Sequence, residues 1–86
     1  MAKGKELELM EGGFYYCETN ENHIYNWIFQ KSDGEDKTSC MYCICINDDY
    51  FGVGGRITGN DDVNNLRVAT NEEQQLLITQ IKNYGK

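Results

Sequence analysis

The clearest pattern of apolar and polar residues lies near the carboxyl end of the chain. Leu77 and Ile81 stand four residues apart, so both belong on one face of an α-helix. Thr70 occupies the position of a helix N-cap, and Glu73 follows three residues later. This is the spacing of a capping box, in which each of the two side chains binds the backbone N–H of the other residue. The pattern predicts a helix over residues 71–83 with Thr70 as its N-cap.

The residues before this helix have the two-residue period of β-strands. The strongest candidate is 23–29, where Tyr25, Trp27 and Phe29 fall on one face. Turns rich in glycine, asparagine and aspartate separate this segment from other short strand-prone segments. The predicted strands are 5–10, 14–17, 23–29, 39–46 and 50–57.

About five short strands followed by one helix predict a single α+β domain over residues 1–86, with the strands within residues 5–68. One architecture that fits is a small antiparallel β-barrel or strongly curved sheet of the SH3-like kind, with one C-terminal helix. The alternative is an open antiparallel sheet with the helix packed across one face, and patterning does not separate the two. The residues predicted to be largely buried are Trp27, Phe29, Ile44, Leu77 and Ile81.

The chain is acidic, with a formal net charge of −6 at pH 7. Its basic residues are scattered singly, apart from Lys3 and Lys5. Proteins that bind DNA or RNA through the phosphates need a basic stripe that releases counterions. The charge therefore argues against direct nucleic-acid binding and favours a protein partner with a basic surface, although an acidic surface also serves solubility alone.

Membrane and export signals are not evident in the sequence. A membrane-spanning helix needs about 20 apolar residues, and no run of that length occurs. Near the amino end, Leu7 and Leu9 alternate with glutamates instead of forming the continuous apolar segment of a signal peptide. We therefore expect a cytoplasmic protein with no membrane partner.

The cysteines raise the question of a metal site. Cys40, Cys43 and Cys45 lie close together in the sequence, and Cys17 lies upstream. Zinc takes four thiolate or imidazole ligands, but a second CxxC or CxxH pair is missing. On a regular strand Cys43 and Cys45 would point to one side and Cys40 to the other. We expect these thiols to pack in the core with no cofactor, and a small structural zinc domain is the alternative.

No catalytic constellation can be assembled from the sequence. His23 is the sole histidine and has no nucleophile or carboxylate at a recognisable spacing. The glycine-rich segment 52–55 ends at Arg56, but the residues after it lack the helical pattern that a phosphate-binding loop requires. We therefore expect a protein that is not an enzyme.

Aromatic residues are more numerous than one small core needs, because the chain has six tyrosines, three phenylalanines and one tryptophan. Exposed rings beside acidic side chains favour protein recognition, although a thin barrel also leaves some rings uncovered. The candidate binding residues are Tyr15, Tyr25, Tyr50, Phe51 and Arg56.

Two segments carry a resemblance to known sequences. Asn26-Trp-Ile-Phe29, followed later by Arg67-Val-Ala-Thr-Asn-Glu-Glu73, resembles a pattern in small uncharacterised proteins encoded by phages and mobile elements of gut Bacteroidales. In that pattern a Trp-Ile-Phe strand precedes an Arg-x-Ala-Thr-x-Glu-Glu start to the terminal helix. The resemblance covers part of the chain. It implies a small β-barrel-plus-helix module in a host cell cytoplasm, and it brings no activity or catalytic residue with it.

Hypotheses of different classes follow from these observations. The first is a non-enzymatic, phage-encoded protein-binding module that inhibits a host protein of nucleic-acid handling or defence. The second is a protein that binds or sequesters a small ligand such as a nucleotide signal, for which the glycine-rich segment and Arg56 are the motive. The net negative charge favours the first over the second.

Overall fold

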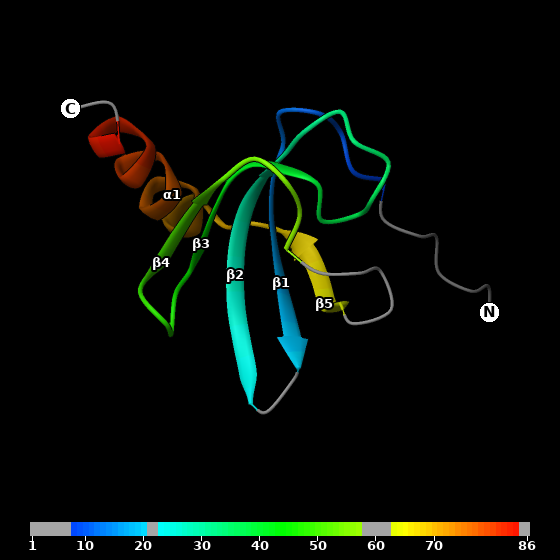
Figure 1. Cartoon of the computed structure of the whole chain (residues 1–86), viewed down its shortest axis with the longest axis horizontal. Helices are drawn as coiled ribbons and strands as arrows, with labels where there is room; N and C mark the ends of the chain where they lie inside the picture. Colours follow the sequence, from blue (N-terminus) through cyan, green and yellow to red (C-terminus); the bar gives the residue numbers. More distant parts are fainter. Residues whose placement is uncertain (1–7, 21–22, 58–62, 85–86) are drawn as a thin grey trace.

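The computed structural model describes residues 8–20, 23–57 and 63–84, which form one antiparallel sheet and one helix (Figure 1). Within these residues the sheet has five strands in the order β4-β3-β2-β1-β5. The elements are β1 (Phe14–Asn20), β2 (Ile24–Lys31), β3 (Cys40–Cys45), β4 (Tyr50–Val53), β5 (Val63–Val68) and α1 (Asn71–Tyr84). The helix therefore begins at the predicted residue and ends one residue later than predicted.

The sheet is open. Among the described residues β4 and β5 are its two edges, and each pairs with one neighbour. The α+β class and the terminal helix are confirmed. Of the two forms predicted, a barrel or a curved sheet, the curved sheet fits, because the two edge strands do not meet and the sheet does not close into a barrel. Residues 5–7 of the strand predicted at 5–10 lie outside the described residues, and residues 8–10 are not strand.

Alternation along the strands gives the sheet two apolar faces. We call the face that carries Trp27 and Phe29 the front face and the other the helix face. The buried cluster of the front face is Tyr15, Cys17, Phe29, Cys40 and Cys43. The buried cluster of the helix face is Tyr16, Ile28, Ile44, Ala69 and Leu77. The helix α1 covers the second cluster by packing on β2 and β3. In Figure 1 its first turns pass behind β3 and β4, and the rest extends beyond the sheet at the upper left.

The predicted core is confirmed in part. Phe29, Ile44 and Leu77 are buried, whereas Trp27 and Ile81 are only partly buried. Trp27 lies on the front face, where α1 does not reach it, and Ile81 packs at the margin of the helix-face cluster. Both residues are therefore on the apolar side of their element without being enclosed.

The junction between β5 and α1 is held by a small polar network. The Arg67 guanidinium donates two hydrogen bonds to the carboxylate of Glu73, each 2.9 Å long, and lies 3.9 Å from the centre of the Tyr16 ring. The backbone N–H of Thr70 donates to Glu73 at 2.9 Å, and the Thr70 hydroxyl accepts from the Glu73 N–H at 3.2 Å. The predicted capping box is confirmed. The hydrogen bonds from Arg67 also hold the pKa of Glu73 below its ordinary value.

Replacement of Thr70 with alanine should lower the free energy of unfolding by about 0.5–2 kcal/mol, because a backbone N–H at the helix start loses its acceptor. Urea denaturation followed by circular dichroism measures the loss. Thr79→Ala is the matched control, because Thr79 is exposed in the helix interior, where alanine is the better helix former. Equal losses in the two variants would contradict the capping role.

Leu77→Ala should cost about 2–5 kcal/mol of stability, because Leu77 is 0% exposed in the helix-face cluster. Leu76 is the neighbouring control. It is 50% exposed, so Leu76→Ala should change the stability by no more than about 0.5 kcal/mol. The same denaturation experiment compares the two, and a Leu77 variant as stable as the parent would show that α1 is not packed on the sheet.

Candidate functional site

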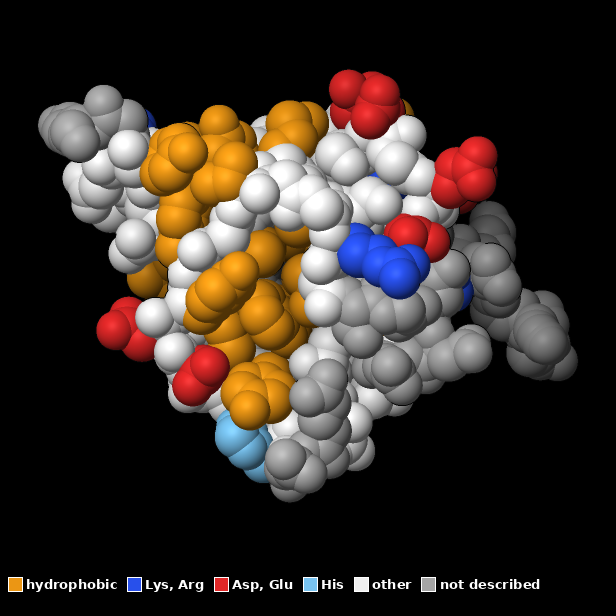
Figure 2. Space-filling view, in the orientation of Figure 1, with side chains coloured by type: hydrophobic (Ala, Val, Ile, Leu, Met, Phe, Trp, Pro, Cys, Tyr) orange, Lys and Arg blue, Asp and Glu red, His pale blue; other side chains and the backbone are white. Residues whose placement is uncertain are grey.

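The front face carries a cavity of about 310 Å³ over β2, β3 and β4, which we call the aromatic groove. Its lining residues are Thr19, Tyr25, Trp27, Cys43, Asp48, Tyr50, Gly52, Val53, Gly54, Arg56 and Ile57. The strand register brings the central residues together, because Trp27 is opposite Cys45 and Cys45 is opposite Tyr50. Figure 2 shows the hydrophobic side chains gathered across the middle of this face, with acidic side chains at the margins.

A glycine opens the floor of the groove. A Cβ atom on Gly52 would lie 3.2 Å from the Cys43 sulfur and 3.0 Å from the ring of Tyr50. Both separations are tighter than ordinary van der Waals contact. Any larger residue at position 52 would therefore push these side chains and fill the base of the groove.

The rings of the groove are positioned by neighbouring groups. The indole N–H of Trp27 donates a hydrogen bond to the Thr19 hydroxyl at 2.9 Å, and the Tyr50 ring meets the Trp27 ring edge-on with 5.9 Å between centroids. Just before the start of β2, the centre of the His23 ring lies 4.1 Å from that of the Tyr25 ring. Trp27 thus has its polar atom satisfied inside the protein while part of its apolar surface faces the groove.

The charged groups of the groove leave a net acidic character. Arg56 forms an ion pair with Asp36 at 2.8 Å, so its charge is already partly balanced. Asp48 makes no ion pair with another described residue. A basic group that entered the groove would therefore meet an unpaired carboxylate.

The structure brings three of the five predicted binding residues together. Tyr25, Tyr50 and Arg56 all line the aromatic groove. Phe51 points to the helix face, because it is one residue removed from Tyr50 along β4. The expectation of an exposed Tyr15 is wrong: the side chain is 5% exposed in the front-face cluster, and its hydroxyl accepts a hydrogen bond from the backbone of Met10.

Trp27 lines the groove, although the sequence predicted it as a buried core residue and not as a binding residue. It shares a strand face with Tyr25, a binding candidate, and with Phe29, a core residue. The alternation showed which face Trp27 occupies. The tertiary structure decides how far along β2 other segments bury the front face. The pattern of residues therefore could not separate the exposed end of β2 from the buried end.

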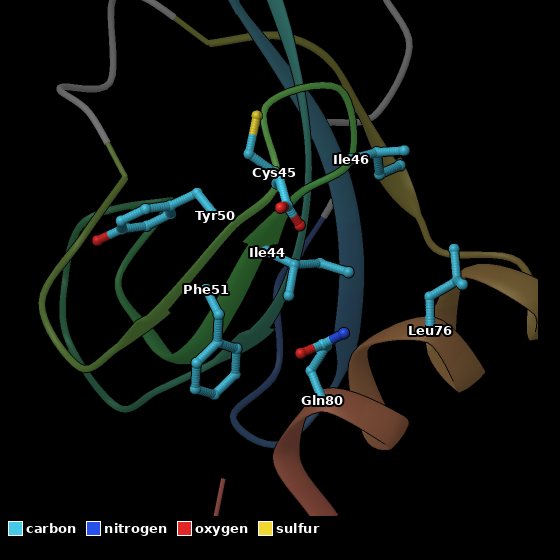
Figure 3. Close-up of a pocket in the computed structure, with 8 residues that line it drawn as sticks. Ile44, Cys45, Ile46, Tyr50, Phe51, Leu76 and Gln80 are labelled. Atoms are coloured by element: carbon cyan, nitrogen blue, oxygen red, sulfur yellow. The ribbon is translucent and has the colours of Figure 1, made fainter. Parts of the chain in front are cut away.

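A second cavity, of about 270 Å³, lies between the β3–β4 hairpin and α1, and we call it the helix-side cavity. Its lining residues are Ile44, Cys45, Ile46, Asp49, Tyr50, Phe51, Leu76 and Gln80. In Figure 3 the side chains of Ile44 and Phe51 face those of Leu76 and Gln80, while the Tyr50 ring points away toward the front face. The two cavities therefore lie on opposite faces of the same hairpin.

The four cysteines are free and buried. The expectation that Cys40 points away from Cys43 is wrong, because the pairing of β2 with β3 shifts register between Gln30 and Lys31. Gln30 pairs with Tyr42, and Lys31 pairs with Cys40, so Met41 has no opposite residue on β2. This bulge turns Cys40 onto the front face. Among the described residues, no group of three or more His, Cys, Asp or Glu side chains could hold a metal ion.

The environment of the thiols disfavours the reactive thiolate at three positions. Burial raises the pKa of Cys17 to about 12. Burial also raises the pKa of Cys45. A hydrogen bond between Cys43 and Cys40 raises the pKa of Cys43 and lowers that of Cys40. Cys40 itself is 2% exposed, so a reagent cannot reach the thiol with the lowered pKa.

Comparisons with known proteins find no match among protein-family models, curated proteins or solved structures. Among the described residues, no helix is both long and apolar enough to cross a membrane. The aromatic groove and the helix-side cavity are therefore interpreted from their own geometry and chemistry.

At about pH 8 the native protein should resist alkylation by iodoacetamide, because its thiols are buried and the reagent attacks thiolates. Protein unfolded in urea should gain four carbamidomethyl groups in the same time, one for each cysteine. Mass spectrometry counts the added groups, and native mass spectrometry of the untreated chain tests for bound zinc. Rapid labelling of Cys43 in the native state would contradict the burial of the groove floor.

Proposed function

We propose that this chain is a non-enzymatic protein-binding module whose aromatic groove takes up part of a partner with a basic surface. The observation that carries the proposal is the meeting of Tyr25, Trp27 and Tyr50 in one cavity beside Asp48, whose carboxylate makes no ion pair within the described part of the chain. Tyrosine and tryptophan are the residues that most often dominate binding energy in protein interfaces, and partly exposed rings of fixed geometry lose little entropy on binding.

The charge of the chain supports a protein partner over bare nucleic acid. The net charge is −6, and the single cation that lines the groove, among the described residues, is already paired with Asp36. A phosphate backbone would meet a repulsive field, whereas a basic protein surface would be attracted. In line with the phage resemblance, the proposed partner is a host protein that handles nucleic acid in the cytoplasm and whose basic groove this chain blocks.

A small-ligand function is the second candidate, and the size of the groove favours it. A cavity of about 310 Å³ lies at the lower end of the range that small-molecule sites occupy, roughly 300–1,000 Å³. The rings of Trp27 and Tyr50 would offer stacking surfaces for a base. The pairing of Arg56 with Asp36 weakens this candidate, because a nucleotide phosphate would have to compete for the guanidinium.

Tyr50→Ala should weaken partner binding by about 2 kcal/mol, a factor of roughly thirty in Kd, because Tyr50 is a 51% exposed ring of the groove. The immobilised chain is used to capture partners from a gut Bacteroidales lysate, and the affinity of each captured protein is then measured by calorimetry. Binding should also weaken as salt rises to physiological strength, because exposed charges are screened over about 8–10 Å.

Tyr84→Ala is the matched control for that experiment. Tyr84 is also an exposed tyrosine, but its ring packs against Tyr42 and Phe51 outside the aromatic groove. Asp48→Asn removes one rim charge and should weaken binding less than Tyr50→Ala. Equal effects at Tyr50 and Tyr84, tight binding to bare DNA, or turnover of a substrate by the chain alone would overturn the proposal.

A further inference from the structure

β4 is an edge strand whose outer side has no partner strand among the described residues. The Gly54 N–H donates to the Met41 carbonyl at 2.8 Å, and Gly52 lies opposite Cys43. In an antiparallel ladder the residues that bond to one neighbour alternate with residues that face the other side. Phe51 and Val53 therefore direct their backbone N–H and C=O groups toward the open edge.

The two cavities lie on either side of this open edge. The aromatic groove is on the front face of β4, and the helix-side cavity is on its helix face, between the hairpin and α1 (Figure 3). Successive side chains of a strand point to opposite faces of the sheet. A strand added beside β4 would therefore place alternate side chains near one cavity and then the other.

We propose that the partner segment binds as an extended strand that pairs with β4, with its alternate side chains directed to the aromatic groove and the helix-side cavity. This inference rests on the proposed function and specifies the manner of binding. Main-chain hydrogen bonds along Phe51 and Val53 supply a sequence-independent part of the affinity. The two cavities supply the selectivity. β4 has four residues, which limits the pairing to a short segment.

The charges of the hairpin select a basic segment as the occupant. Asp48 lines the aromatic groove and Asp49 lines the helix-side cavity, and neither makes an ion pair with another described residue. Each cavity thus combines apolar side chains with one carboxylate, and the Arg56 cation of the aromatic groove is paired with Asp36. This arrangement suits the long apolar stem and cationic end of lysine or arginine. A second copy of the chain is a poorer occupant, because each copy carries a net charge of −6.

The opposite edge of the sheet is less suited to strand addition. Asn65 in β5 has a φ of +53°, and the pairing of β1 with β5 shifts register between Tyr16 and Glu18. Irregularities of this kind twist an edge and interrupt its row of free backbone groups. β4 pairs with β3 without a register shift, so its edge offers the more regular template.

The test uses a phage-displayed library of random 12-residue peptides as the probe. Peptides selected on the full chain are synthesised and titrated, with the fluorescence of Trp27 as the signal, because Trp27 is the sole tryptophan and lines the groove. The selected peptides are expected to be rich in lysine or arginine, with basic and apolar residues alternating along the peptide. Amide chemical shifts should change most at Phe51 and Val53.

Val53→Pro is the decisive variant. Proline lacks the N–H that faces the open edge but leaves the bonds of β4 to β3 in place, and edge strands tolerate it there. Binding should weaken at least about tenfold, because a hydrogen bond is lost and the ring obstructs the added strand. Val53→Ala keeps the N–H and removes only part of a groove-lining side chain. The tenfold loss is therefore measured relative to Val53→Ala, which separates the effect of the backbone from that of the side chain. Peptides methylated at alternate backbone nitrogens give the same test without altering the protein.

The outcomes separate this inference from the proposed function. Loss of binding with Val53→Pro, with Tyr50→Ala and with the methylated peptides supports strand addition. Loss with Tyr50→Ala alone overturns strand addition and leaves the groove as the binding surface. If the library yields no basic peptides whose binding depends on Tyr50, the inference is also overturned. The capture of partners from the lysate then tests the proposed function separately. A dimer in sedimentation that Val53→Pro abolishes would assign the edge to a second copy instead.

Discussion

The sheet has two apolar faces, and the described chain supplies one helix to cover them. α1 packs on β2 and β3 and closes the cluster around Ile28 and Leu77. The front face must shield itself with its own side chains and with flanking segments such as those of Leu9 and Ile57. These groups bury Phe29 completely and Trp27 only in part. The aromatic groove is the part of the front face that remains open.

The position of the helix depends on how it leaves the sheet. Arg67 connects three parts of the structure, because it binds Glu73 in the first turn of α1 and stacks over the Tyr16 ring of β1 from its place in β5. The Tyr16 hydroxyl in turn donates to Glu18 and accepts from Asn26 at 2.6 Å each. A planar guanidinium suits this double role, since it can pair with a carboxylate in its plane while stacking on a ring. Helix placement and sheet register are thereby coupled on the helix face.

The candidate site follows from the same arrangement. Because α1 covers β2 and β3, the β3–β4 hairpin extends beyond it with one cavity on each face and an unpaired edge between them. The hairpin turn carries Asp48 and Asp49, so two carboxylates lie next to the strand whose outer edge has no partner among the described residues. The buried thiols of Cys17, Cys40 and Cys43 belong to the front-face cluster and pack as small apolar groups. These features are the basis of the proposal that the chain recognises a protein segment.

The sequence by itself determined the features that local interactions decide. The capping box needs residues three apart, and the faces of β2 follow from its two-residue period, so the start of α1 and the shared face of Tyr25 and Trp27 were predictable. Net charge was likewise a property of composition. These inferences required no knowledge of which strands are neighbours.

Only the tertiary structure decided the features that depend on strand pairing. The bulge at Met41 turned Cys40 onto the face of Cys43. Tyr15 is buried, whereas the Tyr50 ring is exposed. The edge strands β4 and β5 do not meet, and this decided between the barrel and the curved sheet that the sequence left open. The strand register, the closure of the sheet and the burial of its faces all depend on contacts between residues far apart in the chain. The periodicity along one strand carries no information about such contacts. Tyr25 and Tyr50 could therefore be named as binding residues from the sequence, but the place of Trp27 between them and the meeting of the three rings in one cavity could not.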